Sequence, residues 1–349
     1  MDCVQINGKF IGHGNSCYII AEMSGNHNHN YQKAVEIIYA AKDAGADAIK
    51  LQTYTPDTIT INCDNKYFKI QGNNAWAGQT LYDLYSKAYT PWEWQPKLKV
   101  EAEKVGIALL STPFDISAVD FLNEMDVPAY KIASFELIDL PLIKYVAAKG
   151  KPIIMSTGMG TIDEIKEATQ AVLSTGNKQL ILLKCVSDYP SQPDDINLRT
   201  IPDMRKIFGV PAGLSDHTLA QEVAVAAVAL GACVVEKHFT LKRSDGGPDA
   251  LFSMEPEEFK AMVRGIRLIE KSLGKIRYEP TERELQNKIF RRSLFVVKDV
   301  EAGVKITTSN VRSIRPGYGI SPKHLDETIG KTFKTDIAKG TPLSWDLIQ

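Results

Sequence analysis

The sequence predicts an α/β protein in which a (β/α)8 barrel of the TIM type is followed by a small β-rich domain. Short β-branched runs alternate with longer amphipathic stretches, and eight such units fill about 260 residues, the usual size of this barrel. No glycine-rich GxGxxG turn follows the first expected strand, which disfavours a doubly wound sheet, the alternative. After about residue 275 the chain changes to short runs with frequent glycine and proline and no long helix.

The expected strands are short, apolar and rich in β-branched residues. They cover 18–24, 48–54, 107–113, 129–134, 152–158, 180–186, 210–216 and 233–239. The clearest helices between them are expected at 31–45, 161–176 and 255–274. The second of these begins at a threonine cap, has acidic residues in its first turn and ends at a glycine.

The change in composition sets the expected domain boundaries. We expect a barrel over 1–275, a linker over 276–290 and a β-rich domain over 291–349. The linker is polar and charged, as an exposed segment would be. Within the barrel, the connection 55–90 is unusually long, and long loops after barrel strands often carry function.

Composition excludes several classes of protein. Lys plus Arg is 41 and Asp plus Glu is 42, so the net charge of −1 does not suit bulk binding to nucleic acid or an anionic membrane. The five cysteines form no CxxC pair, which disfavours a disulfide framework or a thiolate zinc site. The first residues do not read as a signal peptide, and the longest apolar run, 223–235, is too short to span a bilayer. We expect a cytoplasmic protein with no nucleic-acid or membrane partner.

Polar residues stand at the ends of all eight expected strands. Because the carboxyl ends of barrel strands face the active site, the joint pattern indicates one shared polar site. A single polar residue at such an end more often caps a strand or contacts solvent. The set comprises Glu22, Lys50, Gln52, Ser111, Thr112, Lys131, Ser134, Glu136, Ser156, Thr157, Ser187, Tyr189, Ser215, Asp216, His217, Glu236, Lys237 and His238.

Two histidines follow neighbouring strands of the expected barrel. His217 and His238 can share one divalent ion and leave its other positions to water and substrate. The alternative is that each only forms a local hydrogen bond. Imidazoles among oxygen donors would suit manganese, zinc or another borderline ion.

Two lysines at strand ends indicate an anion site. Lys50 and Lys131, together with hydroxyl groups on the next strands, can hold a phosphate or a carboxylate. Alternatively, each lysine pairs internally with Glu22, Glu136 or Glu236. A third interpretation is a Schiff-base aldolase that uses one lysine and no metal, which borohydride trapping with pyruvate would reveal.

Several motifs resemble the nonulosonic (sialic) acid synthase family over nearly the whole chain. They are IAEMSGNHN (20–28), GADAIKLQTYTPDTIT (45–60), YKIASFE (130–136), STGM (156–159), GLSDHT (213–218), EKHFTL (236–241), GPDALFSMEP (247–256), RRSL (291–294) and RPGYG (315–319). The C-terminal module resembles the antifreeze-like SAF domain of these enzymes, which has a β-clip fold. The sequences of 52–58 and 81–94 most resemble those of the branch that makes pseudaminic acid.

The resemblance implies a transferase that condenses phosphoenolpyruvate with an acetamido sugar aldehyde and releases phosphate by C–O cleavage. It implies a divalent metal cofactor, usually manganese, with magnesium and cobalt as alternatives. For the pseudaminate branch the acceptor is 2,4-diacetamido-2,4,6-trideoxy-L-altrose. N-acetylneuraminate or legionaminate synthesis by the same chemistry is the alternative.

The resemblance also assigns roles to individual residues of this sequence. Phosphoenolpyruvate contacts are implied for Lys50, Thr112, Lys131, Ser134, Ser156 and Ser215. Ser187 stands where neuraminate synthases carry asparagine, and it is kept as a candidate. Metal ligation is implied for His217 and His238, and sugar-side contacts are implied for Gln52, Phe114, Tyr189, Asp249 and Asn74, with Asn73 as the alternative to Asn74.

The expected catalytic residues are Glu22, Glu136 and Arg315. The two carboxylates, which also match sugar-side positions, would stabilise positive charge and help a water molecule to add. Arg315 matches an arginine that the SAF domain of one subunit sends into the barrel of its partner, which implies a domain-swapped homodimer. A binding protein whose C-terminal module contacts a surface such as ice is the remaining alternative, and an ice-recrystallisation assay on residues 285–349 would identify it.

Overall fold

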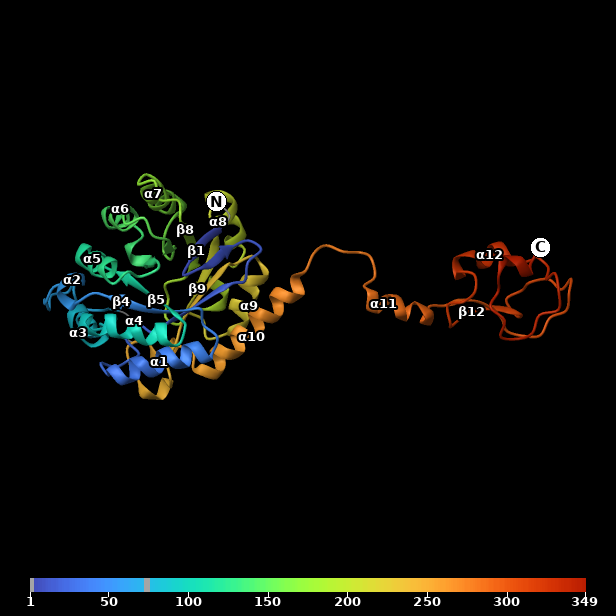
Figure 1. Ribbon diagram of the computed structural model, residues 1–349, viewed down its shortest axis with the longest axis horizontal. Helices are drawn as coiled ribbons and strands as arrows, with labels where there is room; N and C mark the ends of the chain where they lie inside the picture. The colour runs from blue at the N-terminus through green and yellow to red at the C-terminus, as the bar shows by residue number, and fades with distance from the viewer. Residues whose placement is uncertain (1–2, 72–75) are drawn as a thin grey trace. The chain divides into compact units, whose positions relative to one another are not determined.

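The computed structural model describes residues 3–71 and 76–349, which belong to two compact units, Met1–Gly274 and Lys275–Gln349 (Figure 1). The first unit contains a closed barrel of eight parallel strands, so the expected barrel is confirmed. Around the barrel the strands follow the order β10-β3-β4-β5-β6-β7-β8-β9. Their bounds are β3 (Tyr18–Glu22), β4 (Ala48–Thr53), β5 (Ala108–Pro113), β6 (Tyr130–Ile132), β7 (Ile153–Ser156), β8 (Leu180–Cys185), β9 (Ala212–Asp216) and β10 (Val234–His238).

Helices surround this barrel (Figure 1). They are α1 (Tyr31–Asp43), α4 (Gln95–Lys104), α5 (Ile116–Glu124), α6 (Leu140–Ala148), α7 (Ile162–Leu173), α8 (Thr200–Phe208), α9 (Gln221–Ala229) and α10 (Pro256–Leu273). Apolar side chains of strands and helices form one buried core between the two layers. The expected cap of α7 is present, since Thr161 Oγ1 accepts a hydrogen bond from the Glu164 amide at 3.3 Å.

The long connection after β4 carries two further helices, α2 (Pro56–Ile59) and α3 (Leu81–Ala88). Short 3-10 turns complete the connections of both units. They are Trp92–Trp94, Ser134–Glu136, Pro193–Asp195, Arg243–Asp245, Ala250–Phe252, Asn287–Phe290, Pro322–His324 and Trp345–Leu347. No helix within residues 3–71 and 76–349 combines the length and the apolar character that crossing a membrane requires.

An N-terminal hairpin, which the sequence analysis did not identify, closes the amino-terminal end of the barrel. Strands β1 (Cys3–Ile6) and β2 (Lys9–Gly12) pair antiparallel around Asn7 and Gly8, whose φ angles are 46° and 78°. An Asn-Gly pair favours this two-residue turn. Val4, Ile6 and Ile11 are buried in one cluster with residues that the strands turn into the barrel. The polar ends of the strands lie at the opposite, carboxyl end.

The second unit has a small core of its own. Strands β11 (Ser293–Val296) and β12 (Val311–Ile314) pair antiparallel, with the short helices α11 (Glu282–Gln286) and α12 (Leu325–Thr328). Leu294, Phe333 and Leu343 are fully buried in its core. Nearly all of 276–290 is exposed, and this segment includes α11.

Candidate active site

Lysines and carboxylates from neighbouring strands form a buried network at the carboxyl end of the barrel. Lys50 Nζ lies 2.8 Å from Glu22 Oε2, and only 5% and 1% of the two side chains are exposed. Gln52 donates a hydrogen bond to Glu22 Oε1 at 3.1 Å. Lys50 also donates to Thr112 Oγ1 at 3.4 Å. Strands β3, β4 and β5 therefore contribute to one polar cluster.

Glu236 joins this cluster to the opposite side of the barrel. Its Oε1 lies 3.6 Å from Lys50 Nζ and 3.8 Å from Lys131 Nζ, and it accepts a hydrogen bond from Ser215 Oγ at 3.2 Å. Lys131 donates to Ser156 Oγ at 2.7 Å. Both lysines are thus paired with carboxylates, as the alternative interpretation expected. Both also contact Glu236, so their two ammonium groups lie close to the same carboxylate oxygen.

The charges of this network are strongly perturbed. Burial opposes ionisation of Glu236, but the ammonium groups of Lys131 and Lys50 outweigh it and hold the Glu236 pKa below its ordinary value. Burial raises the pKa of Glu22 to about 7, although Lys50 acts against the shift. Burial likewise raises the pKa of Glu136 to about 7. Glu22 and Glu136 can therefore exchange protons near neutral pH, as general acids and bases require.

Small polar groups surround the place where the two lysines meet. Ser134 Oγ accepts a hydrogen bond from the Gly158 amide at 3.1 Å. A side chain at Gly158 would clash with the hydroxyl oxygens of Ser134 and Ser187. Because Gly158 has no side chain, the hydroxyl groups of Ser134 and Ser187 and the nearby backbone amides stay accessible to a ligand. Such an arrangement is typical of anion sites.

His217 and His238 lie side by side, with ring centroids 5.4 Å apart. His217 Nδ1 lies 2.8 Å from the Val186 carbonyl, which leaves Nε2 available to bind a metal. His238 Nδ1 is buried without a hydrogen-bond partner and lies 4.0 Å from Asp249 Oδ2. Burial holds the pKa of His238 well below its usual range, so the ring is neutral, as a metal ligand must be.

The histidine pair fits a divalent ion that takes its other ligands from water and substrate. Within residues 3–71 and 76–349, no group of three or more His, Cys, Asp or Glu side chains is arranged to hold a metal. The buried Nδ1 of His238 is a polar atom that an ion would satisfy. The two imidazoles therefore fit a metal, although they do not form a closed cage.

Aromatic side chains line the space beside the histidines. The Tyr189 ring lies 4.4 Å from the His217 ring, and the Phe252 ring lies 4.9 Å from the His238 ring. Phe114 is half-buried and packs edge-on against Tyr54, with ring centroids 5.2 Å apart. Asp249, beside His238, accepts a hydrogen bond from Ser24 Oγ. The expected sugar-side residues Phe114, Tyr189 and Asp249 thus reach the same end of the barrel.

Two expected site residues do not belong to the described part of the barrel unit. Asn74 and its alternative Asn73 lie outside the described residues. Arg315 follows β12 in the second unit and is exposed there. Conversely, Ser24 and Phe252 were not among the expected site residues, and Glu236 was expected in the polar site and as a possible lysine partner but was given no catalytic or binding role. The two-residue period of a strand places Glu236 on the same face as His238, and that signal was available in the sequence.

Fold and site together define a class: a (β/α)8-barrel protein with a buried, charged site at the carboxyl ends of its strands and a small β-rich unit on the same chain. The chain belongs to the NeuB family, whose model matches residues 37–278, and residues 291–349 match the SAF domain. The second unit therefore contains the expected SAF domain.

Individual relatives agree with this membership. The chain is 43% identical over 93% of its length to pseudaminic acid synthase of Campylobacter jejuni, and it covers 95% of that protein. It is 38% identical over 99% of its length to N,N'-diacetyllegionaminic acid synthase of Legionella pneumophila, of which it covers 98%. The solved N-acetylneuraminic acid synthetase of Leptospira borgpetersenii superposes with a TM-score of 0.73 at 31% identity, covering 82% of this chain and 96% of that chain. The expectation of a transferase agrees with these relatives.

Proposed function

We propose that the chain condenses phosphoenolpyruvate with 2,4-diacetamido-2,4,6-trideoxy-L-altrose, releasing phosphate and forming pseudaminic acid. One observation carries the chemistry: two buried lysines meet at one carboxylate, and a pair of imidazoles lies at the same end of the barrel. The choice of acceptor is supported by the higher identity to the pseudaminic acid synthase than to the legionaminic acid synthase. Legionaminate or N-acetylneuraminate synthesis by the same chemistry is the second candidate.

In this proposal the lysine side of the site binds phosphoenolpyruvate. Its phosphate and carboxylate are held by Lys50 and Lys131, assisted by hydroxyl groups on neighbouring strands. Charge-assisted hydrogen bonds of this kind are about twice as strong as neutral ones. The assisting hydroxyls belong to Thr112, Ser134, Ser156, Ser187 and Ser215. Burial favours loss of charge on both lysines, and Glu236 acts against that effect on the pKa of each.

His217 and His238 would hold the divalent ion, with manganese as the first choice and magnesium or cobalt as alternatives. When bound, such an ion supplies Lewis-acid activation of an aldehyde. Gln52, Phe114, Tyr189 and Asp249 would position the sugar, with Asn74 as a further contact from the long loop. Phe114 and Tyr189 supply flat apolar faces, and Asp249 supplies a hydrogen-bond acceptor for hydroxyl groups.

The carbon chemistry follows from these positions. Carbon 3 of phosphoenolpyruvate attacks the aldehyde carbon, the aldehyde oxygen takes up a proton to become a hydroxyl, and positive charge develops at carbon 2. The carboxylates of Glu22 and Glu136 stabilise this charge and take a proton from the water that adds there. The resulting hemiketal phosphate loses its phosphate group by C–O cleavage, because the added water oxygen stays on carbon 2. The raised pKa values of both carboxyls suit this proton transfer at neutral pH.

We also propose that the protein is a domain-swapped homodimer in the cytoplasm. The exposed Arg315 of one subunit would enter the barrel of its partner and add a cation near substrate oxygens. All five cysteines are free thiols, which suits a reducing compartment. Arg315→Ala should keep the dimer but lose most of its activity. A fully active Arg315→Ala dimer would contradict this role.

The test of the proposed function is phosphate release from phosphoenolpyruvate with manganese, with three acceptors offered separately. They are the diacetamido altrose, its legionaminate-pathway counterpart and N-acetylmannosamine. Release with the altrose derivative alone, abolished by a chelator, is the expected result. Release only with another acceptor would move the enzyme to that branch, and no release with any acceptor would refute the synthase assignment.

A further inference from the structure

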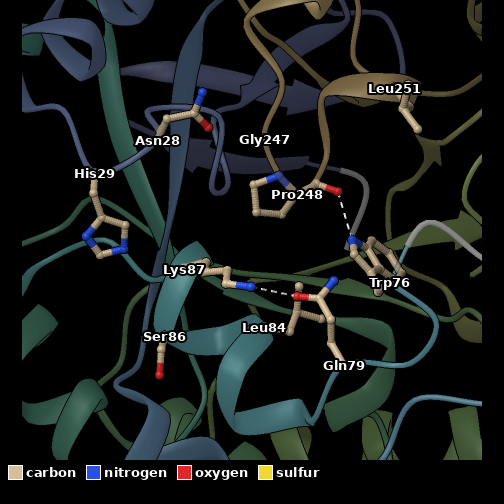
Figure 2. A pocket seen from close by; sticks show the side chains of 10 residues that line it. All are labelled: Asn28, His29, Trp76, Gln79, Leu84, Ser86, Lys87, Gly247, Pro248 and Leu251. Carbon is tan, nitrogen blue, oxygen red and sulfur yellow. Dashed lines mark hydrogen bonds between the residues drawn. The ribbon is translucent and has the colours of Figure 1, made fainter.

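A cavity of about 570 Å³ opens beside the proposed reaction site, at the same end of the barrel. Three connections line it: the segment after β3, the long connection after β4 and the segment after β10. Figure 2 shows Asn28 on one side of Pro248 and Trp76 on the other, with Lys87 and Gln79 facing them. None of its described lining residues belongs to the lysine and histidine cluster.

The cavity shares a wall with the proposed sugar site. The Trp76 indole donates a hydrogen bond to the Pro248 carbonyl at 2.8 Å, and Pro248 directly precedes Asp249. The Trp76 ring centroid lies 5.8 Å from that of Tyr189 and 6.2 Å from that of Phe252. Those two rings in turn contact His217 and His238. Tyr189 and Phe252 therefore connect the surroundings of the histidine pair to the Trp76 wall of the cavity.

The length of the acceptor agrees with this placement. A six-carbon chain with bonds of about 1.5 Å spans roughly 6 Å. The second acetamido group is on carbon 4, and its methyl lies about 7 Å from the aldehyde carbon when the chain is extended, so with the aldehyde at the histidines this group can extend along Tyr189 toward Trp76. A substituent on the outer half of the sugar would point into the cavity.

The polar lining of the cavity matches an acetamido group. Lys87 donates to Gln79 Oε1 at 3.0 Å, and this bond uses one of the three hydrogens of the ammonium group. Lys87 can therefore also donate to an amide carbonyl. Asn28 Nδ2 donates to the carbonyls of Asp245 and Gly246, at 3.2 and 3.1 Å, which leaves Asn28 Oδ1 to accept from an amide N–H.

The apolar lining completes the match. Leu84 and Pro248 border the same cavity and can contact the methyl group of an acetyl substituent. Burying a methyl next to a satisfied amide gives affinity as well as orientation. A hydroxyl in the same position would neither fill the apolar part nor satisfy both polar partners.

We propose that this cavity receives the outer half of the sugar acceptor, and that Asn28, Gln79 and Lys87 recognise its second acetamido group. The assignment rests on the proposed function and identifies the part of the site that selects a diacetamido sugar over a sugar with one acetamido group. Lys87 is exposed, so replacing it removes the ammonium without disturbing the core.

The test compares Lys87→Met with Lys97→Met, which removes the same charge from an exposed position on α4. The substrates are the diacetamido altrose and its analogue with a hydroxyl in place of the second acetamido group. Lys87→Met should lower kcat/KM for the diacetamido sugar by about tenfold to a hundredfold, the value of one hydrogen bond to a charged group. It should leave the hydroxyl analogue and the KM for phosphoenolpyruvate unchanged, and Lys97→Met should change none of these values.

A binding measurement separates this inference from the proposed function. Saturation-transfer NMR of the diacetamido altrose with the full chain should place the second acetyl methyl in contact with the wild-type protein, and Lys87→Met should weaken that signal. If wild type shows this contact but releases no phosphate, the proposed function fails and the cavity assignment holds. No acetyl contact, no effect of Lys87→Met, or an equal loss with both sugars would overturn the assignment.

Discussion

Replacing Lys237 by methionine should lower the free energy of unfolding of the barrel by about 3–5 kcal/mol, the usual effect of removing one partner of a buried ion pair. Lys237 Nζ lies 2.6 Å from Asp216 Oδ2, and neither side chain has any exposed surface. It also donates to the Thr218 carbonyl at 2.5 Å. Burial lowers the pKa of Lys237, and Asp216 opposes that shift. The positive charge of Lys237 is therefore favoured by its contact with Asp216. Without Lys237, the buried Asp216 carboxyl would lose its ion-pair partner.

The matched control is Lys151→Met. Lys151 pairs with Asp126 at 2.5 Å, but 84% of the Asp126 side chain is exposed, so this change should cost at most about 1 kcal/mol. Urea unfolding followed by tryptophan fluorescence measures both variants, since Trp76, Trp92 and Trp94 all lie in the barrel unit. The double variant Asp216→Asn/Lys237→Met should lose less than the sum of its single variants. Equal costs for Lys237→Met and Lys151→Met, or strict additivity, would refute the reasoning.

Three further predictions concern the site itself. Lys131→Met should raise the KM for phosphoenolpyruvate at least tenfold in steady-state assays, because a charge-assisted contact is lost; an unchanged KM would remove Lys131 from the anion site. His238→Gln should weaken Mn²⁺ binding at least tenfold by titration calorimetry while the circular dichroism spectrum stays the same; unaltered affinity would argue against the histidine pair. The buried Glu136, with its pKa raised from 4.5 to about 7, binds a proton more tightly when folded, so the unfolding free energy should fall as pH rises from about 4.5 to 7. Glu136→Gln should reduce that slope, and the remainder should come from Glu22, whose pKa is raised in the same way; an unchanged slope would assign the dependence to groups other than Glu136.

The barrel was predictable because its strands are buried on both faces and therefore form uninterrupted apolar runs. Each run ends abruptly in polar residues, which marked the carboxyl end of the barrel as the site. The N-terminal hairpin was missed because its two strands have only four residues each, although Asn7 and Gly8 form a strong turn signal. The described strands are mostly one or two residues shorter than expected, some at the carboxyl end and some at the amino end.

The sequence predicted which polar residues lie at the carboxyl end of the barrel, but it did not predict how they contact one another. Lys50, Lys131 and Glu236 are far apart in the sequence, and only closure of the barrel brings both ammonium groups within 4 Å of one carboxylate oxygen. Their pKa values depend on that closure and on burial, which sequence spacing does not encode. Three connections from distant parts of the chain line the cavity beside Trp76, so no local sequence pattern could predict it.

The measurement that tests the account most directly follows the bridging oxygen of phosphoenolpyruvate. The chain is incubated with manganese, the diacetamido altrose and phosphoenolpyruvate that carries oxygen-18 between carbon 2 and phosphorus. Mass spectrometry then measures the oxygen-18 content of the sugar acid and of the phosphate. The account predicts a sugar acid product without the label and released phosphate that contains it. Label retained in the sugar acid, or no phosphate released, would contradict condensation by C–O cleavage at this site.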